Sequence, residues 1–162
     1  MRDAEFERLY AAHAEGLFAF LAYRTGDRAL AEDVLADAFE RVLRARRGFD
    51  RRRGSERTWL YTIALNLLRD HLRRTGAEER AIERAGRPGE ETHDPHDAVH
   101  SRDALQRALA TLSQEEREVV ALRFGGDLSL KEIARVLGEP ETTVEGRLYR
   151  GLRRLREEFS VE

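Results

Sequence analysis

The stretch Leu128–Tyr149, LSLKEIARVLGEPETTVEGRLY, decides the fold of the C-terminal part of this 162-residue chain. Its small and apolar residues have the spacing of a helix-turn-helix. Ala134 is small enough for two helices to approach closely, and Gly138 can take the left-handed conformation that ends a helix. Val144 would then face back into the apolar angle between the helices. The pattern therefore predicts the two-helix unit whose second helix enters the major groove of DNA.

Two capping patterns and a row of arginines extend this prediction. Ser129 with Glu132, and Thr142 with Glu145, have the S/T-x-x-E spacing of a capping box at a helix start. An ordinary pair of packed helices would show the same apolar spacing, so the arginines that follow carry the argument for DNA. They lie on the second helix and its extension: Arg147, Arg150, Arg153, Arg154 and Arg156.

Composition excludes several classes of protein. The chain has no cysteine, which rules out a disulfide framework and a thiolate metal site and fits a cytoplasmic location. Its longest apolar run, Leu17–Tyr23, is too short to cross a bilayer, so we expect no membrane insertion. Of the 29 basic residues only Lys131 is a lysine. That bias reflects a GC-rich coding sequence as readily as it reflects DNA binding.

Charge and apolar content divide the chain. The stretch 76–100 is acidic, holds two of the three prolines and has little apolar content after Ile82. Such a segment cannot bury enough apolar surface to offset the entropy lost on ordering. We therefore expect a domain over residues 1–75, a flexible acidic linker over 76–100 with disorder from about Ala77 to Val99, and a second domain over 101–162.

Both flanking parts are predicted to be helical, because strand signals are nearly absent. Apolar residues at helical spacing mark three helices in the N-terminal part, near residues 6–21, 30–43 and 60–72. Two further helices precede the helix-turn-helix. The expected N-caps of these helices are Asp27, Ser55, Ser101 and Ser113, the last in a box with Glu116. The expected fold class is all-α, with two small helical domains joined by a flexible linker.

Specific motifs in both parts resemble those of one protein family. The N-terminal part contains Ala31-Glu32-Asp33, Phe39, Arg41, Phe49-Asp50, WLYTIA at 59–64, Asn66, Asp70, Leu72, Arg73 and Arg74. This series resembles region two of the extracytoplasmic-function (group-four) sigma factors, the small alternative promoter-recognition subunits of bacterial RNA polymerase. The helix-turn-helix, with Thr143-Val144 and RLYR at 147–150, resembles their region four. The resemblance covers nearly the whole chain, and the N-terminal motifs are its specific part.

The chain departs from the family pattern at a few positions. Ala36 stands where the family commonly has Gln, and Leu43 where it has Trp. Glu145 and Gly146 stand where the recognition helix usually has a basic residue followed by Ser. Glu145 could accept a hydrogen bond from a cytosine amino group, although completing the capping box with Thr142 is the simpler expectation. Gly146 costs about 1 kcal/mol relative to alanine in a helix, which indicates a packing reason or a tolerated weakness.

The resemblance implies three binding surfaces. Core polymerase would contact a mixed-charge helix face made of Glu32, Asp33, Asp37, Glu40 and Arg41, which could also be an ordinary solvated face. The upstream promoter element would contact Thr142, Thr143, Glu145, Arg147, Tyr149, Arg150 and Arg153. The downstream element would be bound and melted by Arg46, Phe49, Arg51, Arg52, Arg53, Arg57, Asn66, Arg69 and Arg73.

The residues themselves support the downstream surface. Seven arginines lie between Arg44 and Arg57, a density that attracts phosphates by counterion release, although a solvated loop in an arginine-biased chain is the alternative. Strand opening also requires trapping an unstacked base by stacking and edge contacts. Phe49 and Asn66 are candidates for that task. At least one of Trp59 and Tyr61 must be in the core, and we expect Trp59 there.

Catalysis has little support, and we expect no cofactor. The residue types of a metal site gather only in HDPHDAVH at 93–100, where Pro95 interrupts the pattern and a hydrophilic linker is the simpler interpretation. A small metalloenzyme or an operator-binding helix-turn-helix regulator would each explain one segment. A sigma factor explains both domains and the linker. The expected partners are core RNA polymerase, promoter DNA and an anti-sigma factor, and the expected function is promoter recognition, DNA melting and transcription initiation.

Overall fold

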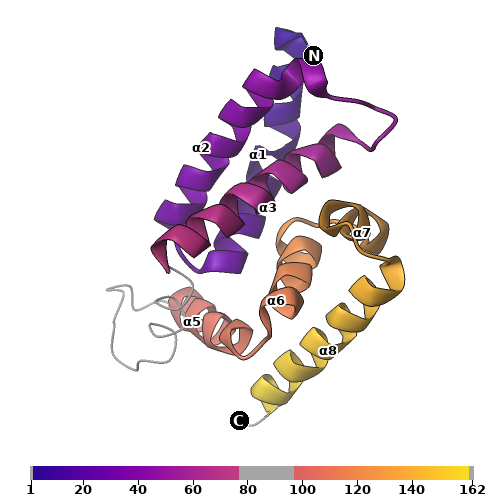
Figure 1. Ribbon diagram of the computed structural model, residues 1–162. Coiled ribbons are helices and arrows are strands. Elements are labelled where there is room, and N and C mark those ends of the chain that lie inside the picture. Colours follow the sequence, from indigo (N-terminus) through magenta and orange to yellow (C-terminus); the bar gives the residue numbers. More distant parts are fainter. Residues whose placement is uncertain (1, 77–96, 161–162) are drawn as a thin grey trace.

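A computed structural model describes residues 2–76 and 97–160 of the chain (Figure 1). All regular elements in these two ranges are helical, which confirms the all-α fold class. The first range contains α1 (Asp3–Thr25), α2 (Arg28–Ala45), the short 3₁₀ helix η1 (Arg46–Gly48) and α3 (Glu56–Thr75). The second contains α5 (Asp97–Ala110), α6 (Gln114–Val120), the π-helical turn η2 (Ala121–Gly125), α7 (Leu130–Leu137) and α8 (Glu141–Ser160).

The structure describes only the two ends of the predicted linker. Residues 77–96, which make up most of it, lie outside the described residues, as do His93, Asp94 and His96. Its predicted C-terminal end is wrong, because α5 begins at Asp97 and residues 97–100 are therefore helical. Ser101 lies inside the same helix, so the prediction that it caps a helix start is also wrong.

Most of the predicted helix starts are confirmed. The side chains of Asp27 and Ser55 accept hydrogen bonds from the amides of Leu30 and Thr58, three residues on. Capping boxes join Ser113 to Glu116 and Ser129 to Glu132. These contacts need only local sequence, because each side chain satisfies an amide of the first helical turn.

The second capping box of the helix-turn-helix, predicted at Thr142 and Glu145, is wrong. Helix α8 already begins at Glu141, so Thr142 lies within its first turn and is not the residue before it. The carbonyl of Pro140 accepts hydrogen bonds from the amides of Thr143 and Val144, at 3.1 and 3.2 Å. Glu145 is an exposed side chain in the second turn of this helix.

The remaining features of the helix-turn-helix are as expected. Gly138 ends α7 in the left-handed conformation, with φ of 66°, and its amide donates to the carbonyl of Ala134. Val144 is completely buried, as is Ile133 on the facing helix. Two short capped helices that meet on an apolar angle thus place the N-terminal turns of α8 at the molecular surface.

The N-terminal part is a three-helix unit built on helical apolar stripes. Leu17, Phe20 and Leu21 of α1 are completely buried, as are residues of α2 and α3 on the facing sides. The prediction that Trp59 is the core aromatic residue of α3 is wrong. Tyr61 is the fully buried core residue, with 1% exposure. Trp59 is only partly buried against the core cluster and contacts Phe49, with 5.0 Å between ring centroids and 41° between ring planes.

The two parts of the chain are packed against each other. One apolar cluster includes Phe20 of α1 and Tyr61 of α3 together with Leu122, Leu128 and Ile133 of the C-terminal part. The elements in contact across the two parts are α3 with α7 and α1 with η2, and Figure 1 shows α7 beside α3. We call this packing of residues 119–133 on α1 and α3 the interdomain contact. The sequence predicts two separate parts, and no local pattern in it indicates this contact.

Two glycines of α8 allow a test of the helix packing. A Cβ added to Gly151 would lie 3.0 Å from Cγ2 of Val120, whose side chain is completely buried and cannot move away. We expect Gly151→Ala to destabilise the fold by about 1–3 kcal/mol. At Gly146 a Cβ would meet only the flexible guanidinium of Arg150, so Gly146→Ala should stabilise it by about 0.5–1 kcal/mol. Urea unfolding of both variants checks this, and effects of the same sign would contradict the packing.

The buried phenol of Tyr61 predicts a pH dependence of stability. Burial raises the pKa of Tyr61 from its ordinary 10.0 to about 12. Since the pKa is higher in the folded chain, the stability linked to the neutral phenol is complete below pH about 10 and is lost as the pH rises through about 12. Tyr61→Phe should therefore lose less stability than the parent chain over that range in urea unfolding. Parallel losses in the two proteins would show that Tyr61 is not responsible.

Candidate DNA interface

The exposed face of α8 is defined by helical spacing from Thr142. Thr142, Glu145 and Tyr149 follow one another at intervals of three and four residues, so they share one face. All three are exposed, and Tyr149 is the most exposed large apolar residue of the described chain, at 68%. Arg153 continues this face and forms only an exposed ion pair with Glu157. These residues can approach DNA without displacing other parts of the chain.

A second face of α8 carries arginines that already have partners. Arg147 forms an ion pair with Glu139, at 3.4 Å between nitrogen and oxygen, and its side chain is only 20% exposed. Arg150 and Arg154 both point to Glu116, at 3.8 and 3.0 Å. Glu116 is almost completely buried and also caps α6. The sequence predicts Glu116 as a capping residue but carries no local signal for its contact with α8.

Glu145 and Gly146 have no packing role among the described residues. Glu145 does not complete a capping box, because α8 begins at Glu141. Its contact with a base stays a prediction. No close neighbour explains Gly146, because a Cβ there would touch only the guanidinium of Arg150, at 3.3 Å. This turn of the helix is therefore free to approach a ligand closely.

The loop between η1 and α3 presents three exposed arginines. Asp50 holds the turn, since its carboxylate accepts from the amide of Arg52, at 2.9 Å, and its carbonyl accepts from the amide of Arg53. The side chains of residues 51–53 point to solvent. Phe49 contacts the tilted ring of Trp59 and is partly buried, so it is less free to receive a base than expected. Arg46 is paired with Asp3, at 2.6 Å.

Three of the predicted downstream residues line one hollow. Asn66, Arg69 and Arg73 border it from α3, with Gln114 at the start of α6. Arg73 is paired with Asp70 on the same helix. Arg69 instead reaches across to the C-terminal part and donates to both carboxylate oxygens of Glu118, at 3.1 and 2.6 Å. These hydrogen bonds raise the pKa of Arg69 above its ordinary value.

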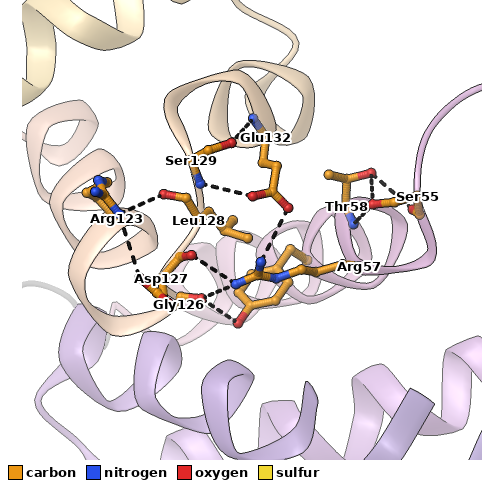
Figure 2. Close-up of polar contacts among 10 residues, drawn as sticks. Ser55, Arg57, Thr58, Arg123, Gly126, Asp127, Leu128, Ser129 and Glu132 are labelled. Carbon is orange, nitrogen blue, oxygen red and sulfur yellow. Dashed lines mark hydrogen bonds and ion pairs between the residues drawn. The ribbon is translucent and has the colours of Figure 1, made fainter. Parts of the chain in front are cut away.

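Arg57 also binds the C-terminal part of the chain. Figure 2 shows its guanidinium enclosed by the loop after η2. It donates to the carbonyls of Gly126 and Asp127, at 2.7 and 3.0 Å, and forms an ion pair with Glu132 at 3.4 Å. The hydroxyl of Tyr61 donates to the same Gly126 carbonyl. The family resemblance predicts a DNA contact for Arg57, and the sequence carries no local signal for these partners.

The predicted polymerase face lies on α2 and is fully accessible. Its five residues are all exposed: Glu32, Asp33, Asp37, Glu40 and Arg41. The opposite side of α2 buries Val34, Ala38 and Val42 in the core. Glu40 is paired with Arg44 one turn on. The arrangement leaves a mixed-charge surface that a protein partner can reach in this conformation.

Two further observations concern other kinds of site. Among the described residues, no three His, Asp or Glu side chains come together in a way that could hold a metal ion. None of the described helices is long and apolar enough to cross a membrane.

Comparison with known proteins identifies both parts. Residues 9–78 match Sigma-70 region 2, and residues 102–155 match Sigma-70 region 4. The chain is 33% identical to the ECF RNA polymerase sigma factor SigL of Mycobacterium tuberculosis over 151 residues, 91% of this chain and 85% of SigL. It is 35% identical to the sigma factor BldN of Streptomyces coelicolor over 93% of this chain, and this match spans 58% of BldN.

A solved structure agrees with these matches. The chain is similar to CnrH, determined in complex with the cytosolic domain of CnrY, with a TM-score of 0.77 and 26% identity. The similarity covers 99% of this chain and 91% of the CnrH chain. Both helical parts are therefore included in one superposition. The chain belongs to the extracytoplasmic-function sigma factors of RNA polymerase.

Proposed function

We propose that this sigma factor binds core RNA polymerase and directs it to promoters, where it recognises two DNA elements and opens the duplex without any catalytic step of its own. The observation that carries this proposal is the presence of region 2 and region 4 in order on one chain. Each region has arginines at its proposed DNA surface. The protein would act in the cytoplasm, where polymerase and chromosome are found.

The upstream element is assigned to α8. Its exposed face offers a hydroxyl, a carboxylate and a phenol at Thr142, Glu145 and Tyr149, which can contact base edges in a major groove. Thr143, Arg147, Arg150 and Arg153 complete the proposed set. Arg147 and Arg150 would have to leave their ion pairs with Glu139 and Glu116 to bind DNA. Their contribution to the free energy of DNA binding is therefore smaller than that of unpaired arginines.

The downstream element is assigned to the η1–α3 loop and the adjoining face of α3. Exposed arginines at 51–53 supply phosphate contacts without sequence preference. Asn66 is exposed and can bond to the edge of an unstacked base, and the Phe49–Trp59 pair offers an aromatic edge. Arg46, Arg57, Arg69 and Arg73 belong to the same surface, with the present partners described above.

Two protein partners complete the proposal. The exposed face of α2 would contact core polymerase. Because CnrH was solved with the cytosolic domain of CnrY, we also propose that a separate anti-sigma protein controls this chain.

Transcription in vitro tests the proposed function. Purified protein and bacterial core polymerase, offered a library of promoter sequences, should initiate at defined start sites, and neither component should do so alone. Failure of the protein to bind core polymerase in a pull-down would overturn the proposal.

Charge reversal on α2 tests the polymerase surface. Asp33→Arg should weaken binding to core polymerase, since it replaces an exposed carboxylate on the proposed contact face. Glu15→Arg, an equally exposed reversal on α1, is the matched control and should bind normally. Titration of core enzyme with each labelled protein measures the affinities. Equal affinities of the two variants would contradict a polymerase contact at this face of α2.

The two DNA surfaces should respond differently to loss of an arginine. Arg150→Ala should cost about 1–3 kcal/mol of promoter binding if Arg150 contacts a base, and relax the preference at one upstream position. Arg52→Ala should weaken binding evenly across sequences and lower the salt slope by about one unit. Arg154→Ala controls for the shared ion pair with Glu116. Loss of the same size on all sequences for Arg150→Ala would remove its base contact.

A further inference from the structure

The second turn of α8 exposes a carboxylate that the fold does not use. Glu145 is exposed, and within residues 2–76 and 97–160 no hydrogen bond or ion pair joins its side chain to another residue. Because α8 begins at Glu141, Glu145 does not cap the helix either. Its carboxylate is therefore available to a ligand that approaches this face of the helix.

The arginines nearest to Glu145 on the helix are directed to other carboxylates. Arg147 is paired with Glu139, at 3.4 Å, and Nε of Arg150 lies 3.8 Å from Glu116. In this structure neither arginine neutralises Glu145. An uncompensated carboxylate is repelled by the phosphates of DNA. Approach of this turn to DNA is therefore favoured only where Glu145 meets a hydrogen-bond donor.

The major-groove edges of the four bases differ in what they offer a carboxylate, which accepts hydrogen bonds and donates none. Cytosine presents the donor N4 amino group. Guanine presents the acceptors N7 and O6, thymine presents the acceptor O4, and adenine presents an acceptor beside its amino donor. A carboxylate in the groove thus attracts cytosine and opposes guanine and thymine, so it selects by repulsion as well as by attraction.

Gly146 leaves room for a base pair beside this carboxylate. It lies one helical turn from Thr142 on one side and from Tyr149 on the other. A Cβ at this position would meet only the flexible guanidinium of Arg150. The helix propensity that the glycine loses is therefore not offset by closer packing within the described chain. Without a side chain there, the backbone of α8 can come close to a ligand.

We propose that Glu145 is a specificity-determining residue of region 4, which selects a cytosine in the upstream element by accepting a hydrogen bond from its N4 amino group, while Gly146 lets the base pair approach the helix. The inference rests on the proposed function, because that function assigns this face of α8 to the major groove. It adds to that assignment the identity of one base and the hydrogen bond that recognises it.

A promoter library tests the proposal with the complete holoenzyme. Core polymerase carrying the parent chain is offered promoters randomised across the upstream element, and sequencing of the transcribed promoters gives the preference at each position. Cytosine should be enriched about tenfold over guanine and thymine at one position. Glu145→Gln should transfer that preference to adenine, because a glutamine amide pairs with N6 and N7 of adenine. An unchanged cytosine preference in Glu145→Gln would overturn the inference.

Glu141→Gln is the matched control, since Glu141 is an exposed carboxylate on the same helix with no assigned contact. It should keep the preference of the parent chain. An equal change of preference in both glutamine variants would show an effect of helix charge and overturn the inference. Selection of an upstream element without the cytosine would also overturn it and leave the proposed function intact. Absence of initiation on every promoter would overturn the proposed function, and this inference with it.

Removal of a single amino group tests the hydrogen bond itself. Pyrimidin-2-one, which lacks the amino group, replaces the selected cytosine in the promoter. The parent holoenzyme should then bind about tenfold more weakly, whereas Glu145→Ala, which has no carboxylate to lose a partner, should respond little. Any change in duplex stability is common to both measurements. Equal losses for the two proteins would assign the amino group to another contact and overturn the inference.

Gly146→Ala tests the close approach independently of the carboxylate. It should lower the affinity of the holoenzyme for the selected promoter severalfold, because the added Cβ fills the surface that faces the base pair. The same variant is expected to resist urea better than the parent chain. A glycine with only a structural role would not separate stability from binding in this way. An unchanged promoter affinity would overturn the part assigned to Gly146.

Discussion

The direct contact of η2 with the backbone of α1 is the constraint on which the arrangement of this molecule depends. It is possible only because Gly125 has no side chain, and Cα of Phe20 takes the space that a Cβ would need. Once the two backbones touch, Leu122 and Leu128 enter the core of the N-terminal helices. Arg57 and Tyr61 then reach the carbonyl of Gly126. The close packing of η2 on α1 thereby positions the Gly126 carbonyl for its hydrogen bonds with Arg57 and Tyr61.

This arrangement leaves some of the proposed binding surfaces exposed and covers part of another. The mixed-charge face of α2 and the face of α8 that contains Thr142 and Tyr149 are open to partners. On α3, Arg73 and Arg74 are exposed to solvent, whereas Arg57 and Arg69 contact region 4. Arg57 and Arg69 therefore belong both to the proposed downstream surface and to the interdomain contact.

The sequence predicted those features that depend on neighbouring residues. The caps at Asp27, Ser113 and Ser129 and the left-handed Gly138 follow from three or four residues each, and all are present. Prediction failed where a more distant or competing contact decided the outcome. Helix α8 begins directly after Pro140, whose carbonyl accepts from the first turn, and not after Thr142. Tertiary packing buries Tyr61 more completely than Trp59. Glu116 and Glu118, which accept from Arg154 and Arg69, lie 38 and 49 residues away from these partners along the chain, beyond the reach of any local pattern.

Regions 2 and 4 share one apolar core in this structure, so we expect them to open as one cooperative unit. Residue-resolved hydrogen exchange of the full chain tests this most directly, because it reports the opening free energy of each helix. Amides of α1 around Leu21 and amides of α7 around Ile133 should exchange with the same opening free energy and the same dependence on urea. Full exchange of the α7 amides while those of α1 stay protected would contradict a shared core.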